Sequence, residues 1–470
     1  MGDHELEIKY DDEAKKSPFG QVFLKLYSPN SEAVIHCAMV VRDPIDVESL
    51  KNTISNSMMM KHPRFCSLWV RKDNQWKRTH VNIDDHIIVH DTIEDDDNDD
   101  EEAAINSFLA EISVCTPLSE SKPLWEVHVL TGLKCVVLRV HHSVGDGVSL
   151  MSMLSACFGK TTPVSETGNG VDDASHGKKD GEKHGVWGLV KRKWFTFLLL
   201  LFRVLGRVLW LIKDKVSVLS GGHGVEILPR KLVTAKFLME DFKSIKQAIP
   251  KATINDVLLG IISSGFSKYL SIKSSNAVQQ AFQLTAIIAV NLRKDFIIQD
   301  ISDLMITGSR SRSELSGWGN KTMVVFLPIN CCNGLHPLEH VRAMKAAMDK
   351  KKQSFEAHLM YRISNFVVSC FGPKVGSWCC RRLEGSTTLV ISNIRGPSEE
   401  IVIGDNPVTN IKVNVSSTSQ AIMMHMVSYA GQVNLQVIVA KDIIPDPELL
   451  VKCFQDSFLE MKSFIDISQV

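Results

Sequence analysis

The residues of this sequence best suited to chemistry form one run: His141, His142, Ser143, Val144, Gly145, Asp146 and Gly147. The run lies between two apolar segments, so it turns from a strand into a helix at a loop mouth, where ligands commonly bind. Neutral imidazole has a pKa near working pH and accepts a proton from a hydroxyl. We therefore predict that an imidazole of this pair, His141 or His142, acts as a general base. Asp146 holds the loop by bonding backbone N–H groups or an arginine, while Gly145 and Gly147 permit the turn.

Two other kinds of chemistry fit this run less well. Adjacent histidines do not chelate one zinc ion well, unlike a pair four residues apart on a helix, so we predict no metal. Ser143 stands beside His142, which raises the alternative of a serine nucleophile. No Gly-x-Ser-x-Gly elbow surrounds it, however, and neighbouring side chains of a strand point apart.

The elements that must position this run alternate between strands and helices. Before residue 159 the apolar patterns predict strands at 33–41, 65–70, 125–130 and 135–141, and helices at 45–60 and 103–112. After residue 216 they predict strands at 284–291, 322–329, 387–394, 411–415, 422–430 and 433–440, and helices at 254–270, 340–368 and 447–464. Strands mixed with helices in both halves indicate two α/β lobes with a site between them.

Composition divides the chain and excludes several classes of protein. Residues 159–186 are polar and rich in Gly and Ser, so we predict a disordered linker between residues 1–158 and the helix at 187–216 that precedes a second lobe at 217–470. Lys+Arg and Asp+Glu both number 53, so no net field draws the chain to nucleic acid. The 11 cysteines and the polar start indicate reduced thiols and no signal peptide, as in a cytosol-facing protein. The acidic run 94–102 is interpreted as a solvated loop or a helix lead-in.

Residues 187–216 form an unusually apolar segment. Five of its polar residues fall on one side of a helix, within an arc of about 60° at about 100° per residue. They are Arg192, Thr196, Arg203, Arg207 and Asp214. One polar stripe on an apolar helix is typical of a helix lying in a membrane interface, which we predict here. A helix packed on the protein and a membrane-spanning helix are the alternatives.

Further motifs accompany the histidine run in a fixed order. They are Pro123-Leu124-Trp125-Glu126, Asn255-Asp256, Asn291-Leu292-Arg293, Trp318-Gly319-Asn320 and Ser392-Asn393-Ile394-Arg395-Gly396-Pro397. Together with His-His-x-x-x-Asp-Gly they resemble the plant-type wax ester synthase/diacylglycerol acyltransferases, within the superfamily of CoA-dependent acyltransferases. The resemblance extends over nearly the whole chain.

The resemblance implies two chloramphenicol-acetyltransferase-like lobes with the active site in a tunnel between them. His142 would be the base, and Asp146 a structural residue paired with Arg293. The residues Asn255, Asp256, Ser392 and Asn393 would line or brace the site, and the Asn393 amide would donate to the developing oxyanion. Helix capping explains Asn255-Asp256 equally well, and a turn explains Ser392–Pro397.

The implied substrates are acyl-CoA, as a co-substrate with no permanently bound cofactor, and a long-chain alcohol or diacylglycerol. The membrane surface would be a partner through residues 187–216. The implied location is the cytosolic face of the endoplasmic reticulum, with the plasma membrane as the alternative. Two rival functions share the fold: a soluble acyltransferase of phenolic or other specialised metabolites, which shares His-x-x-x-Asp-Gly, and a non-catalytic lipid-binding homologue.

Overall fold

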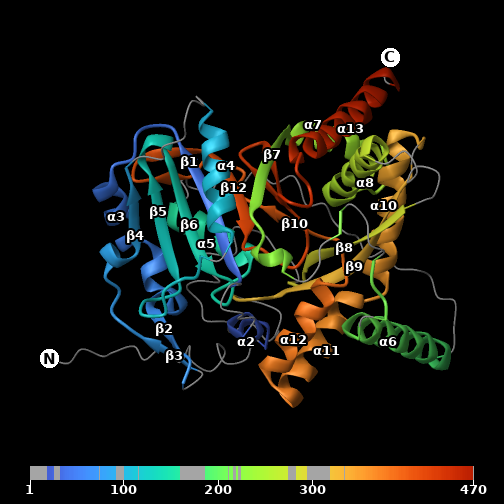
Figure 1. The fold of residues 1–470 in the computed structure, drawn as a ribbon, viewed down its shortest axis with the longest axis horizontal. Coiled ribbons are helices and arrows are strands. Elements are labelled where there is room, and N and C mark those ends of the chain that lie inside the picture. Colours follow the sequence, from blue (N-terminus) through green and yellow to red (C-terminus); the bar gives the residue numbers. More distant parts are fainter. Residues whose placement is uncertain are drawn as a thin grey trace.

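The protein consists of two lobes that lie side by side, each built on a six-stranded sheet (Figure 1). The computed structural model describes residues 18–25, 32–72, 75–91, 100–114, 116–158, 186–209, 211–214, 219–220, 224–273, 282–293, 318–332 and 334–468. This architecture confirms the two α/β lobes predicted from the sequence. The predicted linker, residues 159–186, lies outside the described residues except for its last position.

The first sheet has the strand order β11-β12-β1-β6-β5-β4. Its strands are β1 (Val34–Val41), β4 (Ile87–His90), β5 (Trp125–Leu130), β6 (Cys135–His141), β11 (Val402–Ile403) and β12 (Asn406–Val415). Side chains alternate between the two faces of a strand. Ile35 and Cys37 therefore pack toward α5 (Gly147–Phe158) on one face, while Ala38 packs on the other against α4 (Glu101–Ile112) and the second lobe.

Smaller elements complete the first lobe. They are the helix α3 (Val47–Ser55), the hairpin β2 (Ser67–Val70) and β3 (Gln75–Arg78), and 3-10 turns at Met58–Lys61, Pro63–Cys66, Ile83–Asp85 and Thr131–Leu133. The helix α2 (Pro18–Lys25) lies between the lobes: Leu24 packs in the core of the first lobe, and Lys25 O accepts from the Ser377 hydroxyl of the second. The end of the acidic run is a helix lead-in: Asp100 caps α4 and Glu102 lies in its first turn. From there Glu102 forms an ion pair with the buried Lys412 of β12, at 2.8 Å. Residues 94–99 lie outside the described part of the chain.

The second sheet has the order β7-β14-β13-β10-β8-β9. Its strands are β7 (Arg230–Leu238), β8 (Phe282–Asn291), β9 (Thr322–Cys331), β10 (Leu389–Arg395), β13 (Ile422–Tyr429) and β14 (Gln432–Ala440). One face is covered by α7 (Met239–Gln247), α8 (Ile254–Lys273), α10 (Pro337–Gln353) and α13 (Pro447–Ser468). The opposite face meets α6 (Val186–Val208), α11 (Glu356–Phe371) and α12 (Pro373–Glu384) over β8 and β9, and the first lobe elsewhere.

The second half of the chain contributes two strands to the first sheet. β11 and β12 follow β10 of the second lobe, yet β12 pairs antiparallel with β1 and so completes the first sheet. The predicted strand 411–415 is therefore the end of β12, and the range 217–470 contains two strands that pack in the other lobe. The pairing ties the lobes together through the backbone.

Most predicted elements are present, with different ends. The predicted helix 340–368 is two helices, α10 and α11, because Phe355 takes a left-handed conformation with φ of 54° between them. The predicted strand 65–70 begins at Ser67, after a 3-10 turn that ends at Cys66. β7 lies in a segment for which the sequence analysis predicts no strand.

The apolar helix α6 is fastened to the second lobe at its C-terminal end. Leu200, Val204 and Val208 lie four residues apart and pack in one cluster with side chains of β8, β9, α11 and α12. Arg207 donates to Ser386 O at 2.9 Å and to Thr285 Oγ1 at 3.2 Å. The predicted polar stripe is thus divided, because Arg207 faces the protein while Arg203 is exposed.

The chain after α6 continues this attachment. Asp214 accepts hydrogen bonds from the hydroxyls of Thr285 and Thr388, both at 2.6 Å. The outer side of α6 is apolar and exposed, at Leu198, Leu199, Phe202, Leu205 and Leu209. Among the helices that the structure describes, none combines the length and the apolar character needed to cross a membrane.

Candidate active site

The histidine run is held at the end of β6 by the strands on either side. His141 N–H donates to Leu124 O at 3.0 Å, and His142 N–H donates to Ala33 O at 2.6 Å. Trp125, on the neighbouring strand, is fully buried and donates through its indole N–H to Phe65 O at 2.9 Å. Buried backbone and indole groups need such partners, so this pairing fixes where the run leaves the sheet.

His142 meets Asn320 of the second lobe. Nδ1 of His142 lies 2.9 Å from Asn320 Oδ1, and Asn320 Nδ2 donates to the carbonyl oxygen of His142 at 2.9 Å. The second bond fixes which end of the amide is the acceptor. Nδ1 of His142 therefore carries the proton, and Nε2 is left with the lone pair that a general base needs.

The surroundings of His142 keep it neutral. Its ring stacks on Phe23 of α2, with 4.1 Å between ring centroids. Burial lowers the pKa of His142, and the negative charge of Asp146 opposes this only in part. Because the side chain keeps some exposure, a neutral imidazole is available to a substrate at neutral pH.

His141 is enclosed by the protein and contacts Ser143. It is fully buried, and its Nδ1 accepts from the Ser143 backbone N–H at 3.1 Å and lies 2.7 Å from Ser143 Oγ. Burial lowers the pKa of His141 to about 3, with the neighbouring His142 adding to the effect. The Ser143 hydroxyl thus contacts His141 rather than His142.

Asp146 forms a two-point ion pair with Arg293, the contact that the family resemblance implies. Nη1 of Arg293 donates to Oδ2 at 2.9 Å, and Nη2 donates to Oδ1 at 3.1 Å. Both side chains are buried, and the pair joins the start of α5 to the end of β8. Such two-point pairing fixes the orientation of both groups, and hence of the lobes that carry them.

Further donors and acceptors complete this connection. Asp146 accepts from the backbone N–H groups of Ser149 and Lys321, at 3.0 and 2.9 Å, and from the Thr322 hydroxyl at 2.8 Å. Arg293 also donates to Gly319 O at 2.7 Å. Burial alone would raise the pKa of Asp146, but the charge of Arg293 and these donors outweigh it and hold that pKa below its ordinary value.

The two glycines of the run allow close packing. A Cβ at Gly147 would lie 2.8 Å from Ile394 of β10, and one at Gly145 would lie 3.2 Å from the Trp318 ring. Trp318 also donates through its indole N–H to Val144 O at 2.7 Å. Ile394 and Trp318 of the second lobe therefore pack against the two glycines of the turn.

The other predicted site residues lie where β10 meets α8. Asn393 donates through its amide to Asn255, near the start of α8, and Ser392 precedes it on β10. Thr253 and Asp256 bond reciprocally, with Asp256 Oδ2 accepting from the Thr253 N–H and hydroxyl, both at 2.8 Å. This is a capping box, so Asp256 caps the helix, the alternative considered from the sequence.

The sequence analysis missed three functional contacts: Asn320, Phe23 and Trp318. Two of them belong to the Trp318-Gly319-Asn320 motif, which the sequence analysis quotes without assigning a role. Asn320 and His142 are 178 positions apart, and only folding brings them together. Among the described residues no group of three His, Cys, Asp or Glu side chains could hold a metal ion.

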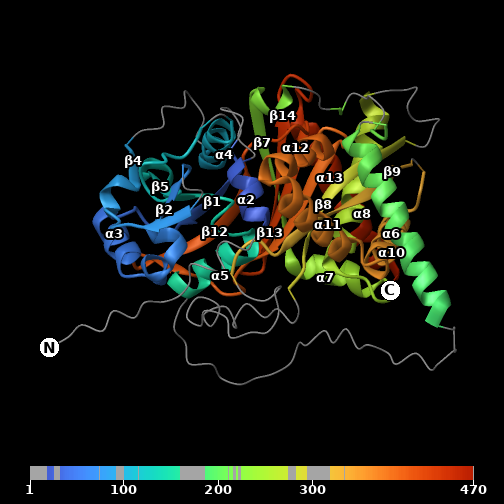
Figure 2. The ribbon, with the colours of Figure 1, turned by 90° about the horizontal axis from the view of Figure 1, so that it is seen from below.

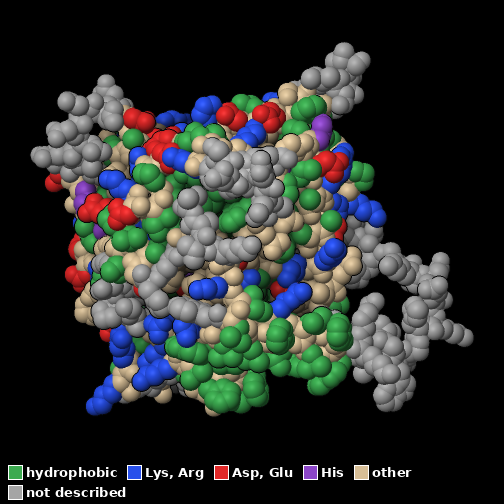
Figure 3. All heavy atoms as spheres, turned by 45° about the vertical axis from the view of Figure 1, so that its right-hand side comes forward, with side chains coloured by type: hydrophobic (Ala, Val, Ile, Leu, Met, Phe, Trp, Pro, Cys, Tyr) green, Lys and Arg blue, Asp and Glu red, His purple; other side chains and the backbone are tan. Residues whose placement is uncertain are grey.

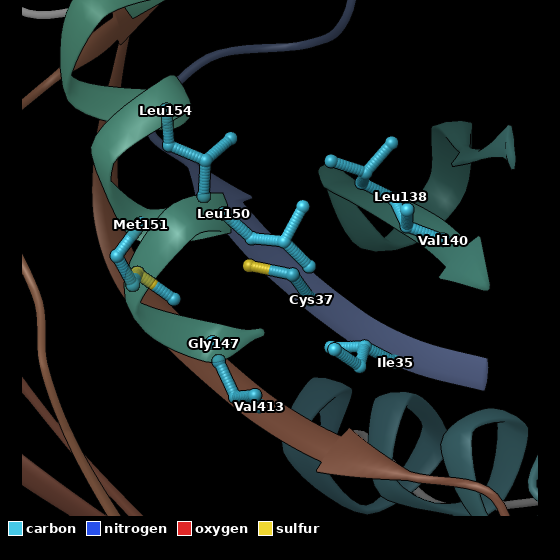
Figure 4. A pocket seen from close by; sticks show the side chains of 9 residues that line it. All are labelled: Ile35, Cys37, Leu138, Val140, Gly147, Leu150, Met151, Leu154 and Val413. Atoms are coloured by element: carbon cyan, nitrogen blue, oxygen red, sulfur yellow. The ribbon is translucent and has the colours of Figure 1, made fainter. Parts of the chain in front are cut away.

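A small apolar cavity lies beside the run, between α5 and strands β1, β6 and β12 (Figure 4). Its lining is Ile35, Cys37, Leu138, Val140, Gly147, Leu150, Met151, Leu154 and Val413. Its volume is about 10 Å³, room for about one water molecule. It is too small for an acyl chain in this conformation.

Replacing Asp146 should destabilise the protein. Asp146→Asn leaves the Arg293 charge buried without its counter-charge, which costs about 3–5 kcal/mol in comparable pairs. Because the pKa of Asp146 is lowered by folding, its contribution is fully present above the ordinary carboxyl value of about 3.9. This contribution to stability is lost as the pH falls through the lowered pKa of Asp146 in the folded protein. Urea unfolding of both proteins across this pH range measures the difference.

Asp456→Asn is the matched control, since Asp456 pairs with Lys452 on the exposed side of α13 at 3.0 Å. An exposed pair of this kind contributes about 0–1 kcal/mol. Equal losses for the two substitutions would contradict the role given to the buried pair.

Comparisons with known proteins cover both lobes. Residues 72–216 match the wax ester synthase/diacylglycerol acyltransferase catalytic domain, and residues 318–462 match the WS/DGAT C-terminal domain. Wax ester synthase/diacylglycerol acyltransferase 10 of Arabidopsis thaliana is 31% identical over 96% of this chain and 98% of its own. Wax ester synthase/diacylglycerol acyltransferase 1 of the same plant is 31% identical over 92% of this chain and 91% of its own.

Solved structures show the same fold at lower identity. The wax ester synthase/diacylglycerol acyltransferase from Marinobacter aquaeolei VT8 gives a TM-score of 0.59 at 16% identity, covering 96% of this chain and 99% of that one. The trichothecene 15-O-acetyltransferase from Fusarium sporotrichioides gives 0.56 at 13% identity, covering 96% and 94%. Nothing among the comparisons favours either rival function considered from the sequence. The chain is an acyltransferase that belongs to the wax ester synthase/diacylglycerol acyltransferase family.

Proposed function

We propose that this chain transfers a fatty acyl group from acyl-CoA to the hydroxyl of a long-chain alcohol, of diacylglycerol, or of both. The first reaction makes a wax ester and the second a triacylglycerol. Acyl-CoA serves as a co-substrate, and no permanently bound cofactor is needed. The observation that carries the proposal is the His142–Asn320 pair, which leaves Nε2 of a neutral imidazole as a proton acceptor beside residues of both lobes.

His142 takes the hydroxyl proton as the alcohol oxygen attacks the thioester carbonyl. The carbon–sulfur bond of the intermediate then breaks, coenzyme A leaves as a thiolate, and the proton on the imidazolium neutralises it. Asn393 uses one amide hydrogen on Asn255 and has a second that can donate to the oxyanion. Asp146 and Arg293 contribute by holding the lobes in place. A tunnel between the lobes would bring the two substrates together.

The proposal includes contact with the membrane surface through residues 187–216, at the cytosolic face of the endoplasmic reticulum or at the plasma membrane. The exposed apolar side of α6 supports this contact, because interfacial binding grows with the apolar area that enters the lipid. Both acceptors are lipids, so an enzyme at that surface meets them where they are dissolved.

His142→Ala should lower turnover by about two to four orders of magnitude, the usual contribution of a positioned general base. Asn320→Leu should lower turnover less and leave the KM for acyl-CoA little changed, because it removes the partner of the His142 ring and carbonyl but leaves the imidazole itself in place. Release of the coenzyme A thiol measures both. His141→Ala is the control: a greater loss of turnover for it than for His142→Ala, in folded protein, would reverse the assignment.

The activity of the wild-type enzyme should fall on the acid side, because the base works only when neutral. Burial lowers the pKa of His142, so the acid limb of kcat/KM should have its midpoint below the ordinary value of about 6.5. An acid limb centred above that value, and unchanged in Asn320→Leu, would assign the titration to another group.

Transfer should be direct, with no acyl-enzyme. The Ser143 hydroxyl is buried against His141, and burial raises the pKa of Cys37 and Cys135 to about 12. Thiols of this kind are poor nucleophiles. Initial-rate plots against both substrates should intersect rather than run parallel. Radiolabel from acyl-CoA that stays on denatured protein and is chased off by added alcohol would overturn the direct mechanism.

A further inference from the structure

The helices α11 and α12 form a hairpin whose outer side is apolar and exposed. They are joined at Gly372, which has a φ of 81°, a conformation that favours glycine. Phe366 and Phe371 on α11 are 62% and 63% exposed, and Val375 and Trp378 on α12 are 38% and 43% exposed. Apolar side chains of this size are costly to leave in water as a group, so the hairpin marks an interaction surface.

The hairpin continues the exposed side of α6. α6 packs in one cluster with Met360 and Tyr361 of α11 and Leu383 of α12. Figures 1 and 2 place the three helices together at the lower side of the protein, next to α2. Figure 3 shows apolar side chains gathered at that lower edge, with basic side chains nearby. One apolar surface is thus built from two parts of the sequence.

The exposed charges on these helices share one sign. Arg203, Arg362, Lys374 and Arg381 are exposed. The sequences of α6, α11 and α12 contain only two acidic residues, Glu356 and Glu384. Glu356 is buried and pairs with Lys351 at 2.7 Å, and Glu384 is half-buried at the end of α12. None of the described exposed side chains on these helices is therefore acidic.

A second copy of the chain fits this surface poorly. A two-fold dimer places the same patch on both subunits, so the four cations of one copy would face those of the other with no exposed carboxylate from these helices to pair them. Trp and Phe beside Lys and Arg are instead the composition of a helix surface that lies in the lipid headgroup region. Anionic headgroups supply the counter-charges that the described exposed side chains of these three helices do not.

We propose that α6 and the α11–α12 hairpin together form a docking face for a phospholipid bilayer that contains anionic lipid. The docking face comprises the exposed apolar residues of the three helices, with Arg203, Arg362, Lys374 and Arg381. The apolar residues enter the headgroup boundary and the cations bind the lipid phosphates. The inference deepens the proposed function, on which it rests in assuming that the acceptor is a lipid.

The docking face lies one helix away from the proposed base. The Ser377 hydroxyl of α12 donates to Lys25 O of α2 at 2.9 Å, and a Cβ at Gly376 would lie 3.1 Å from Val22. The next residue of α2, Phe23, stacks on His142. Docking therefore turns the α2 side of the site toward the bilayer, the side from which a lipid hydroxyl would arrive.

Sedimentation of the purified full chain with vesicles tests the docking face. The vesicles are phosphatidylcholine alone, or phosphatidylcholine mixed with phosphatidylserine. The hairpin variant Phe366→Gln/Phe371→Gln/Trp378→Gln should bind both kinds at least about tenfold more weakly than wild type. The charge variant Arg362→Gln/Lys374→Gln/Arg381→Gln should bind neutral vesicles like wild type and lose the preference for phosphatidylserine, which added salt should also reduce.

The control variant Ile272→Gln/Leu459→Gln replaces apolar residues on α8 and α13 that are 60% and 59% exposed, away from the docking face. It should bind like wild type. Unchanged vesicle binding by the hairpin variant would show that the hairpin is not part of the docking face. If the charge variant kept the preference for phosphatidylserine, these cations would not be the site that binds anionic lipid. A lipid-free dimer that the hairpin variant dissociates would make the surface a protein interface and overturn the proposal.

Activity in detergent separates this inference from the proposed function. With acyl-CoA and a long-chain alcohol dispersed in neutral micelles, the hairpin and charge variants should turn over like wild type, and their melting temperatures should match. The wild type could bind vesicles and yet be inactive in micelles toward both alcohols and diacylglycerol. That result would contradict the proposed function and still support the docking face. Melting temperatures lowered only in the hairpin variant, with normal binding by the charge variant, would assign those aromatic residues to folding.

Discussion

The buried ion pair between Asp146 and Arg293 is the interaction on which the arrangement of the site depends. Two charges without water are stable only when their hydrogen-bonding capacity is filled. Here Ser149, Lys321 and Thr322 fill that of Asp146, and Gly319 O accepts from Arg293. The same segment then carries Asn320 to His142. The charge of Asp146 thus acts through position, since it holds the loop from which the proposed base receives its partner.

The addition of β11 and β12 to the first sheet gives this ion pair a fixed frame. Because β12 pairs with β1 along seven registered positions, the second lobe cannot shift along the first without breaking backbone hydrogen bonds. Gly147 then admits Ile394 at a distance that a Cβ would not allow, and Gly145 admits the Trp318 ring where a Cβ would be tightly packed. The chain connection from β10 to β12, the pairing of β12 with β1 and the Asp146–Arg293 ion pair therefore all fix the second lobe relative to the histidine run.

α6 shows how the same residue types take opposite roles on two sides of one helix. Its packed side carries Leu200, Val204 and Val208, and its outer side carries residues such as Phe202 and Leu205 that meet no described part of the protein core. Arg207 faces the protein, where its hydrogen bonds fix the rotation of the helix. That rotation leaves an apolar side outward, next to the hairpin of α11 and α12.

The sequence by itself determined the elements and the chemistry of the histidine run. Short apolar runs located β1, β5 and β6, because strands that are buried on both faces carry apolar side chains almost continuously. The order of the motifs identified the family, and an arginine partner for Asp146 followed from that resemblance. Capping explained Asp256, because Thr253 and Asp256 are near in sequence and their bond is local.

Only the tertiary structure decided the contacts between distant segments. Nothing in the residues around Asn320 indicates that its amide sets the tautomer of a histidine 178 positions away. Nor does the helical period of residues 187–216 reveal that Arg207 faces Ser386, because a period gives the relative angle of side chains and not which side the protein covers. The place of β12 in the first sheet has the same cause: strand pairing is chosen among all free edges at once, and sequence patterns describe each strand alone.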